Sequence, residues 1–306
     1  ALYRGHLPGH RLRQGAERSV LVRPGDFFDF VPLDRPRLRL TTLIDALVAI
    51  GCIIVIAAWF SGHPILYSQT SPVMSPFTAL SILIMVGTRQ ARLHFDTWPM
   101  VLSLAMSGLV LGGNASSIVM LTTTPAEIWG TFPDLVLTSV MTSIGLILFC
   151  AYDLIIELRE TPRSAFIMDD LLIHLALVPG GLSLLGYLLG NPTYLSIHAD
   201  PRVGISPLEM LFMGAYAVAA VVSNPRLFLW HFLAARRSNR MVFGLLFLNQ
   251  FVAPLLVAIF LYRPGASGLG VEVFVMLAGV VATMSFLLAQ ARVARRDDGG
   301  SAPLAA

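Results

Sequence analysis

Charged residues are scarce in this sequence of 306 residues, and lysine is absent altogether. Asp, Glu, Lys and Arg together make up 13% of the chain, whereas an ordinary soluble domain carries roughly 25%. Hydrophobic residues make up 56% of the chain, and the mean hydropathy is +0.74. This composition argues against a soluble enzyme, a nucleic-acid-binding domain and a disordered chain, and it indicates a polytopic membrane protein.

Cysteine and histidine are also sparse. The two cysteines, Cys52 and Cys150, lie inside apolar stretches, which argues against a disulfide framework, an iron–sulfur cluster or structural zinc. His174 alone lies well inside a predicted span, whereas two b-type haems need pairs of histidines on facing helices. The sequence also lacks a nucleotide-binding loop, a zinc-protease motif and a nucleophile elbow. We therefore expect no catalytic residues, no metal and no cofactor.

Eight apolar segments reach or approach the length of about 20 residues that crosses a bilayer, and each therefore predicts a membrane span. The second and the sixth are short. The predicted spans are Leu40–Phe60, Ser75–Thr88, Trp98–Leu121, Pro133–Ile156, Leu171–Leu189, Ser206–Val222, Met241–Tyr262 and Gly268–Gln290. The predicted fold class is an all-α bundle of eight transmembrane helices. It is divided into a basic N-terminal tail, two four-helix units and a short C-terminal tail, at residues 1–39, 40–165, 166–296 and 297–306.

The arginines indicate the orientation, because cytoplasmic loops collect positive charge. The N-terminal tail holds eight arginines, and those of the loops after the second, fourth and sixth spans and of the C-terminal tail bring this side to 19 of the 21. The opposite loops hold only Arg202 and Arg263. We predict a multi-pass protein of the bacterial cytoplasmic (inner) membrane with both termini in the cytoplasm.

The two halves share a pattern at equivalent places. The first span ends in Gly62-His63-Pro64 and is followed by Ser75-Pro76, and the fifth span ends in Gly190-Asn191-Pro192 and is followed by Ser206-Pro207. Ser before Pro favours a helix start, and Gly before Pro favours a helix end. This repetition favours a duplicated four-helix unit with parallel copies. The alternative is that both patterns are common punctuation of membrane helices.

The first copy continues as Met74-Ser75-Pro76-Phe77-Thr78-Ala79-Leu80, and this pattern resembles the multi-span N-terminal sensor regions of bacterial histidine kinases and diguanylate cyclases. In the second copy, Leu208-Glu209-Met210 replaces Phe-Thr-Ala. The resemblance implies a non-catalytic membrane module that signals to a cytoplasmic output domain. No kinase, cyclase or coiled-coil sequence follows Arg296. We therefore expect the output domain to be a separate protein or to be absent from this chain.

Ionisable residues at membrane depth are candidate functional residues because they are costly to bury. Asp45 lies in the first span, Asp153 near the end of the fourth, and Asp170 and His174 lie one helical turn apart at the start of the fifth. Together these four form a candidate intramembrane site for a cation or for protons. The alternative is that the acids lie at headgroup level, where Asp170 would also favour a helix N-terminus.

Other polar residues have two interpretations each. Asn114 in the third span, and Asn249 and Gln250 in the seventh, predict either helix packing or a pocket for a polar ligand or quinone headgroup. Glu209 and Glu272, near the outer ends of the sixth and eighth spans, predict either an external cation- or proton-sensing pair or ordinary interfacial acids. These alternatives are open at the level of sequence.

The N-terminal tail carries an aromatic segment beside the membrane. Phe27, Phe28 and Phe30 are candidates for contact with lipid or with a partner protein. The leading functional hypothesis is a sensory or signal-transducing membrane module with a protein partner and no nucleic acid. The second is an accessory subunit of a respiratory or photosynthetic membrane complex, and the third is a small ion or solute transporter.

Overall fold

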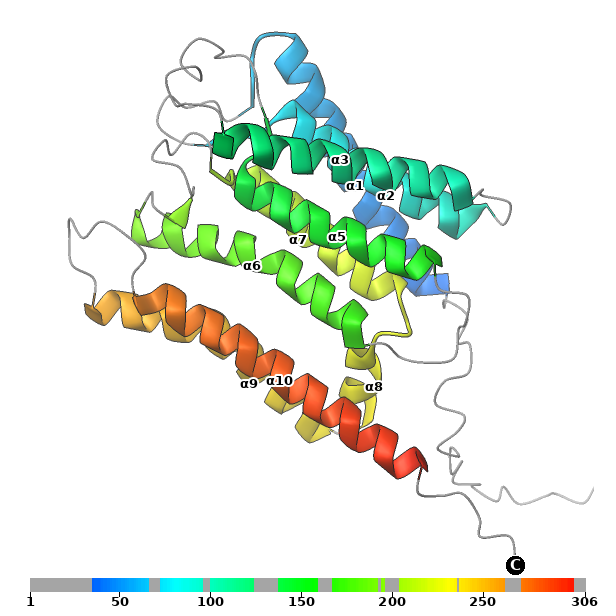
Figure 1. Cartoon of the computed structure of the whole chain (residues 1–306), viewed down its shortest axis with the longest axis vertical. Helices are drawn as coiled ribbons and strands as arrows, with labels where there is room; N and C mark the ends of the chain where they lie inside the picture. Colours follow the sequence, from blue (N-terminus) through cyan, green and yellow to red (C-terminus); the bar gives the residue numbers. More distant parts are fainter. Residues whose placement is uncertain are drawn as a thin grey trace, which may run out of the picture.

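The computed structural model describes nine stretches of the chain. They are residues 35–65, 72–95, 100–123, 137–158, 167–191, 194–195, 204–235, 237–261 and 271–299. The regular structure of these stretches is helical throughout, which confirms the predicted all-α class (Figure 1). The helices are α1 (Arg35–Phe60), α2 (Pro76–His94), α3 (Met100–Thr123), α5 (Val140–Leu158), α6 (Ile167–Leu189), α7 (Pro207–Ser223), α8 (Phe228–Ala235), α9 (Arg237–Leu261) and α10 (Val271–Gly299).

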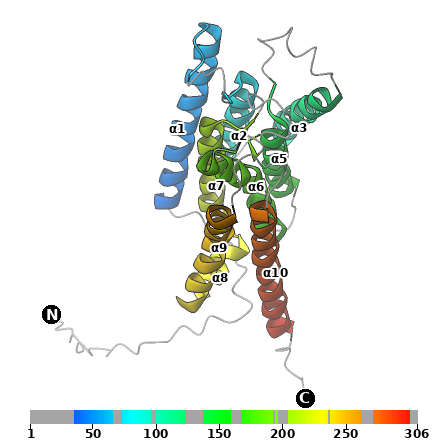
Figure 2. The ribbon, with the colours of Figure 1, turned by 90° about the vertical axis from the view of Figure 1, so that its left-hand side faces the viewer.

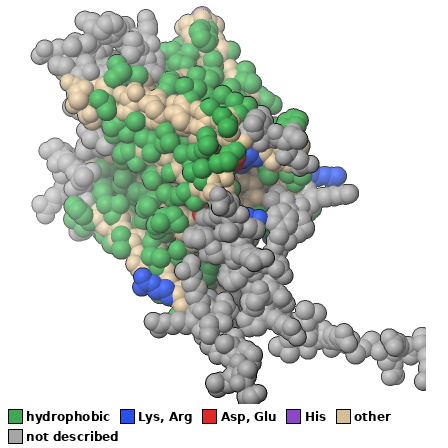
Figure 3. Space-filling view, turned by 45° about the vertical axis from the view of Figure 1, so that its right-hand side comes forward, with side chains coloured by type: hydrophobic (Ala, Val, Ile, Leu, Met, Phe, Trp, Pro, Cys, Tyr) green, Lys and Arg blue, Asp and Glu red, His purple; other side chains and the backbone are tan. Residues whose placement is uncertain are grey.

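Six of these helices are long and apolar enough to cross a membrane, namely α1, α3, α5, α6, α9 and α10. The other two predicted spans correspond to α2 and α7. Helix α7 is apolar but has only 17 residues, and α2 carries Arg89 and Arg92 near its C-terminal end. Hydrophobic side chains cover most of the described surface in Figure 3, as expected of a surface that faces lipid. These features support a multi-pass membrane protein.

The predicted helix starts and helix ends are confirmed at four residues. The Ser75 side chain accepts the backbone N–H of the third residue of α2, and Ser206 forms a capping box with Glu209 at the start of α7. At the ends of α1 and α6, Gly62 and Gly190 adopt φ angles of 75° and 62°, which is the left-handed conformation that glycine tolerates best. These residues carry the predicted repeat, whereas duplication of the whole unit stays a prediction.

The main core lies among α1, α2, α5, α6 and α7. Its largest fully buried side chains include Ile82, Phe149, Tyr152, Met213 and Tyr216. Helix α3 packs along α5, and α9 and α10 pair with each other beside α6 (Figures 1 and 2). The main core therefore contains helices from both predicted halves.

Helix α8 was not predicted. The sequence analysis places a loop between the sixth and seventh spans. The segment Phe228–Ala235 is a short helix instead. This stretch is apolar and lies between Arg226 and Arg236. The Asp170 side chain of α6 accepts two of its backbone N–H groups, as described below. Helix α8 contacts both α9 and α6.

Candidate functional site

Asp45 of α1 and Arg89 of α2 form a buried ion pair. The Asp45 side chain is fully buried and that of Arg89 is 4% exposed. The Arg89 Nε donates to one carboxylate oxygen at 2.9 Å, and a terminal nitrogen donates to the other oxygen. Gln90 adds a bond to the same carboxylate at 2.5 Å and accepts one from Thr42 at 3.3 Å. This bidentate geometry orients both charged groups and joins α1 to α2.

A second ion pair joins α2 to α5. The guanidinium of Arg92 donates to the Asp153 carboxylate at 2.9 Å and lies 3.4 Å from the carboxylate of Glu157, one turn further along α5. Arg92 also donates to the backbone carbonyl of Asp153 at 3.3 Å. The Arg92 and Glu157 side chains are partly exposed, so this pair forms the more accessible edge of the charged region.

Tyr216 of α7 connects the two ion pairs. Its phenol donates a hydrogen bond to Asp153, while the guanidinium of Arg89 lies over its ring, 3.9 Å from the centroid. Arg89 also donates to the backbone carbonyl of Tyr216 at 3.3 Å. A cation over an aromatic face is favourable, most of all where water is excluded. One connected set of side chains, here called the buried ion-pair network, therefore links four helices; it consists of Asp45, Arg89, Arg92, Asp153, Glu157 and Tyr216.

The network fixes the relative positions of α1, α2, α5 and α7. Breaking a buried ion pair by removing one partner costs about 3–5 kcal/mol, because the other charge is left without compensation. Asp45 is fully buried, and its loss would leave Arg89 buried without its carboxylate. The arrangement is suited to holding helices in register.

The sequence predicted Asp45 and Asp153 but not their partners. Arg89 and Arg92 were assigned to a cytoplasmic loop because the second predicted span ended at Thr88, whereas α2 continues to His94. Tyr216 gave no signal, since a tyrosine in an apolar helix is typical of a core. One pattern in the sequence could have indicated the pairing. Arg89 and Arg92 lie within about one turn after the end of the second predicted span, at a membrane depth similar to that of Asp45 and Asp153.

Asp170 and His174 are not brought together with Asp45 and Asp153. The two oxygens of Asp170 accept the backbone N–H groups of Phe228 and Leu229 at 2.9 and 3.1 Å. Asp170 of α6 therefore caps the N-terminus of α8. An N-cap residue normally accepts such N–H groups within its own helix, whereas here the acceptor comes from a different helix. Its functional prediction as a cation or proton group has no geometric support in this arrangement.

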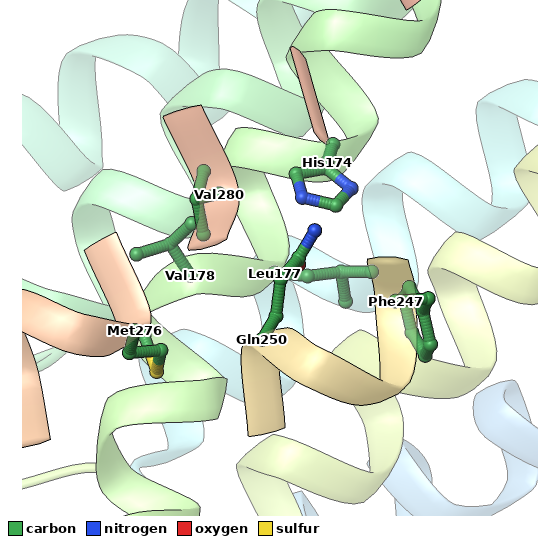
Figure 4. A pocket seen from close by; sticks show the side chains of 7 residues that line it. All are labelled: His174, Leu177, Val178, Phe247, Gln250, Met276 and Val280. Atoms are coloured by element: carbon green, nitrogen blue, oxygen red, sulfur yellow. The ribbon is translucent and has the colours of Figure 1, made fainter. Parts of the chain in front are cut away.

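His174 instead faces a small pocket between α6, α9 and α10. The ring of Phe247 lies edge-on to His174, with centroids 6.5 Å apart, and the amide nitrogen of Gln250 points toward the imidazole (Figure 4). Gln250 also donates to Thr283 of α10. The other walls are apolar, and the room at the centre fits roughly one water molecule. As it stands, the pocket is too small for a quinone headgroup.

The two asparagines have different positions. Asn249 is exposed on the outer face of α9 and lies outside the pocket that Gln250 lines. Asn114 is fully buried, and its amide nitrogen donates to Ser81 at 3.3 Å and to the Val110 carbonyl at 2.8 Å. Its carbonyl oxygen has no partner among the described residues. These bonds agree with the packing interpretation of Asn114.

A polar cluster lies at the opposite end of α2, α5 and α7 from the network. Each of these three helices begins with a serine whose hydroxyl accepts the N–H of the third helical residue. Those third residues are Thr78, Thr142 and Glu209. The Glu209 carboxylate accepts the Ser206 N–H at 2.8 Å and the Thr142 hydroxyl at 3.4 Å.

The same carboxylate also reaches α2. The Thr78 hydroxyl and the Ser75 backbone N–H lie within hydrogen-bonding range of it, and the Thr78 hydroxyl oxygen also lies 3.2 Å from that of Thr138. Glu209 is only 1% exposed. The set of residues that meets here is called the Glu209 cluster; it consists of Ser75, Thr78, Thr138, Thr142, Ser206 and Glu209. The side chain of Glu272, its predicted partner, lies outside the described residues.

Function has to be inferred from these residues themselves. Comparisons with protein families, with curated proteins and with solved structures find no match for the chain. In the described stretches, no group of three or more His, Cys, Asp or Glu side chains is placed to hold a metal ion. Phe27, Phe28 and Phe30, the predicted lipid or partner contacts, lie outside the described residues.

Proposed function

We propose that the chain is a non-catalytic signal-transducing module of the bacterial inner membrane, with eight spans and both termini in the cytoplasm. Its helices would transmit a change at the outer face to a protein partner on the cytoplasmic side. The arginine distribution supports this orientation. In this orientation, the buried ion-pair network would lie toward the cytoplasm and the Glu209 cluster toward the outside. The resemblance of Met74–Leu80 to bacterial sensor regions agrees with the proposal.

The observation that carries the proposal is that the same three helices are joined at both ends. Helix α2 contributes Thr78 to one cluster and Arg92 to the other, which is a separation of about 21 Å at 1.5 Å per residue. Helix α5 likewise contributes Thr142 and Asp153. In α7, Glu209 and Tyr216 occupy the two clusters. Because the two clusters join the same three helices, a change in helix packing at one cluster is expected to alter the packing at the other.

Such a unit suits transmission by a small shift of the packed helices relative to one another. Small displacements at one end of packed helices are carried to the other because packed cores are not continuously deformable. Helix α1 joins the unit through Asp45, and the N-terminal tail enters the membrane through α1. A change at the Glu209 cluster would therefore reach the tail and the partner that binds there.

The first test is to purify the full chain from native membranes in mild detergent and to identify the polypeptides that accompany it. A histidine kinase, a cyclase or another regulatory protein in fixed stoichiometry is the expected result. Stoichiometric cytochromes, iron–sulfur proteins or pigment-binding chains would overturn the proposal and favour an accessory subunit of a respiratory or photosynthetic complex.

The second test measures the activity of the co-purified partner with variants of this chain. Arg89→Gln removes the charge that joins α1 to α7, so we expect the partner to lose its response while it stays bound. Arg292→Gln is the matched control, because Arg292 is exposed on α10. An unchanged response with Arg89→Gln would contradict transmission through the network.

A further inference from the structure

Glu209 is a fully buried carboxylate at the point where three helices begin. Its oxygens accept a backbone N–H from its own capping box and a hydroxyl from α5, and α2 supplies two more groups within reach. These partners are all neutral. The carboxylate therefore depends for its charge on hydrogen bonds and on the positive ends of three helix dipoles.

Protonation would weaken every one of these interactions. A neutral carboxyl group loses its attraction to the helix dipoles, and its hydrogen bonds lose the strength that an ionised acceptor gives. The bonds that hold α2, α5 and α7 together at this end would weaken at the same moment. At the other end of these helices, each carboxylate of the network faces an arginine instead of neutral groups alone.

We propose that Glu209 is a proton-binding residue through which the module responds to the pH outside the membrane. This inference rests on the proposed function and names its stimulus. At high pH, the ionised carboxylate holds the three helix starts together. At low pH, the protonated form releases them, and the shift passes along the helices to the buried ion-pair network.

Among the described residues, the titratable side chains at this end of the molecule include Tyr187 and His63. Tyr187 of α6 donates to the Ile205 carbonyl at 2.9 Å and lies close enough to Glu209 to interact with its charge. His63 follows α1 and is exposed, with its ring against the Ser61 carbonyl at 2.8 Å. From α2 and α5, the groups that face Glu209 are the hydroxyls and N–H groups named above. Tyrosine ionises only near pH 10, so His63 is the group that the test must separate from Glu209.

Trp59 offers an intrinsic reporter of this cluster. Its indole N–H donates to the carbonyl of Met74 at 2.8 Å, and Met74 directly precedes the Ser75 cap of α2. A movement of the α2 start changes this hydrogen bond and therefore the emission of Trp59. The full chain needs to keep Trp59 as its only tryptophan, with phenylalanine in place of the other three; these are Trp98, Trp129 and Trp230.

The experiment follows Trp59 emission in lipid vesicles while the pH on one side is varied from about pH 4 to pH 9, a range that brackets both a carboxyl and an imidazole. We expect Trp59 emission to show one single-proton transition when the outer face is titrated. This transition should be lost in Glu209→Gln and retained in His63→Gln and in Glu272→Gln. A transition that persists in Glu209→Gln, or that is absent from the parent chain, would overturn the proposal.

Thr142→Val covers the case in which Glu209→Gln fails to fold. This variant keeps the carboxyl group and removes a donor to its ionised form, so we expect the midpoint to move to higher pH. An unmoved midpoint would contradict the assignment. The measurement involves no partner protein, so its failure leaves the proposed signalling function standing, and a failure to find a regulatory partner leaves the titration of Glu209 standing.

Discussion

The guanidinium of Arg89 lies over the ring of Tyr216 at 3.9 Å, and the phenol of the same tyrosine donates to Asp153. One aromatic side chain thus contacts the cation of one ion pair and the anion of another. The two ion pairs bring together residues 44 and 61 positions apart in the chain. Tyr216 is the residue through which α7 joins both.

The Asp45–Arg89 pair predicts a non-additive pair of substitutions. Asp45→Leu alone leaves the Arg89 charge buried, so we expect the free energy of unfolding to fall by about 3–5 kcal/mol. Asp45→Leu combined with Arg89→Met removes both charges and is expected to cost far less than the single change. Thermal unfolding of the purified chain in detergent measures both variants. Additive costs would show that the two residues are not energetically coupled.

Two substitutions of Tyr216 are expected to lower the free energy of unfolding to different extents. Tyr216→Phe keeps the ring below Arg89 and removes the bond to Asp153, for an expected cost of about 1.5–3 kcal/mol, which is typical of hydrogen bonds to charged groups. Tyr216→Leu also removes the cation–π contact and should cost more. Tyr152→Phe is the control, since its phenol donates to a neutral carbonyl at 3.3 Å. Equal losses in Tyr216→Phe and Tyr152→Phe would contradict a charged partner for Tyr216.

Asp170 predicts a local effect on α8. Asp170→Ala removes the acceptor of the Phe228 and Leu229 N–H groups, so we expect hydrogen exchange at these two amides to accelerate by roughly ten-fold, the equivalent of about 1.4 kcal/mol for a lost cap. Asp170→Asn keeps one acceptor oxygen and should have a smaller effect. If α8 stayed equally protected in Asp170→Ala, the capping role would be wrong.

Gly279 predicts a close approach of α10 to α9. A Cβ at this position would lie 3.1 Å from the Gln250 Cα, so Gly279→Val should separate the two helices and lower the unfolding temperature. Gly244→Val on α9 is the matched control, because a Cβ there meets open space. Both variants can be compared in one thermal-unfolding series. Equal midpoints for the two variants would argue against tight packing at Gly279.

Local features of the fold could be predicted from the sequence, and long-range pairings could not. The starts at Ser75 and Ser206 were predictable because capping depends on residues within one turn. Asp45 and Asp153 were predictable as costly buried acids. Arg89 was not, because the rule that assigns arginines to cytoplasmic loops takes no account of a carboxylate that approaches from another helix.

Asp170 and His174 have different surroundings in the structure. Their spacing of one turn suggested a joint site, but side chains one turn apart can face different neighbours when two elements pack against one helix. Asp170 contacts α8, and His174 faces α9 and α10. The sequence also gave no sign that the Glu209 side chain would be enclosed by α2 and α5, since its position near a helix start is typical of an interfacial acid.

The central claim is that the Glu209 cluster and the buried ion-pair network are mechanically coupled. The most direct test measures the distance between spin labels at the network end, on cysteines introduced at His94 of α2 and Leu158 of α5, which are both exposed. Cys52 and Cys150 are replaced by serine in this background, and pulsed electron paramagnetic resonance gives the distance distribution.

We predict that Glu209→Gln changes this distribution and that adding Arg89→Gln abolishes the difference. Identical distributions with and without Glu209→Gln, in protein of unchanged helical content, would contradict the account.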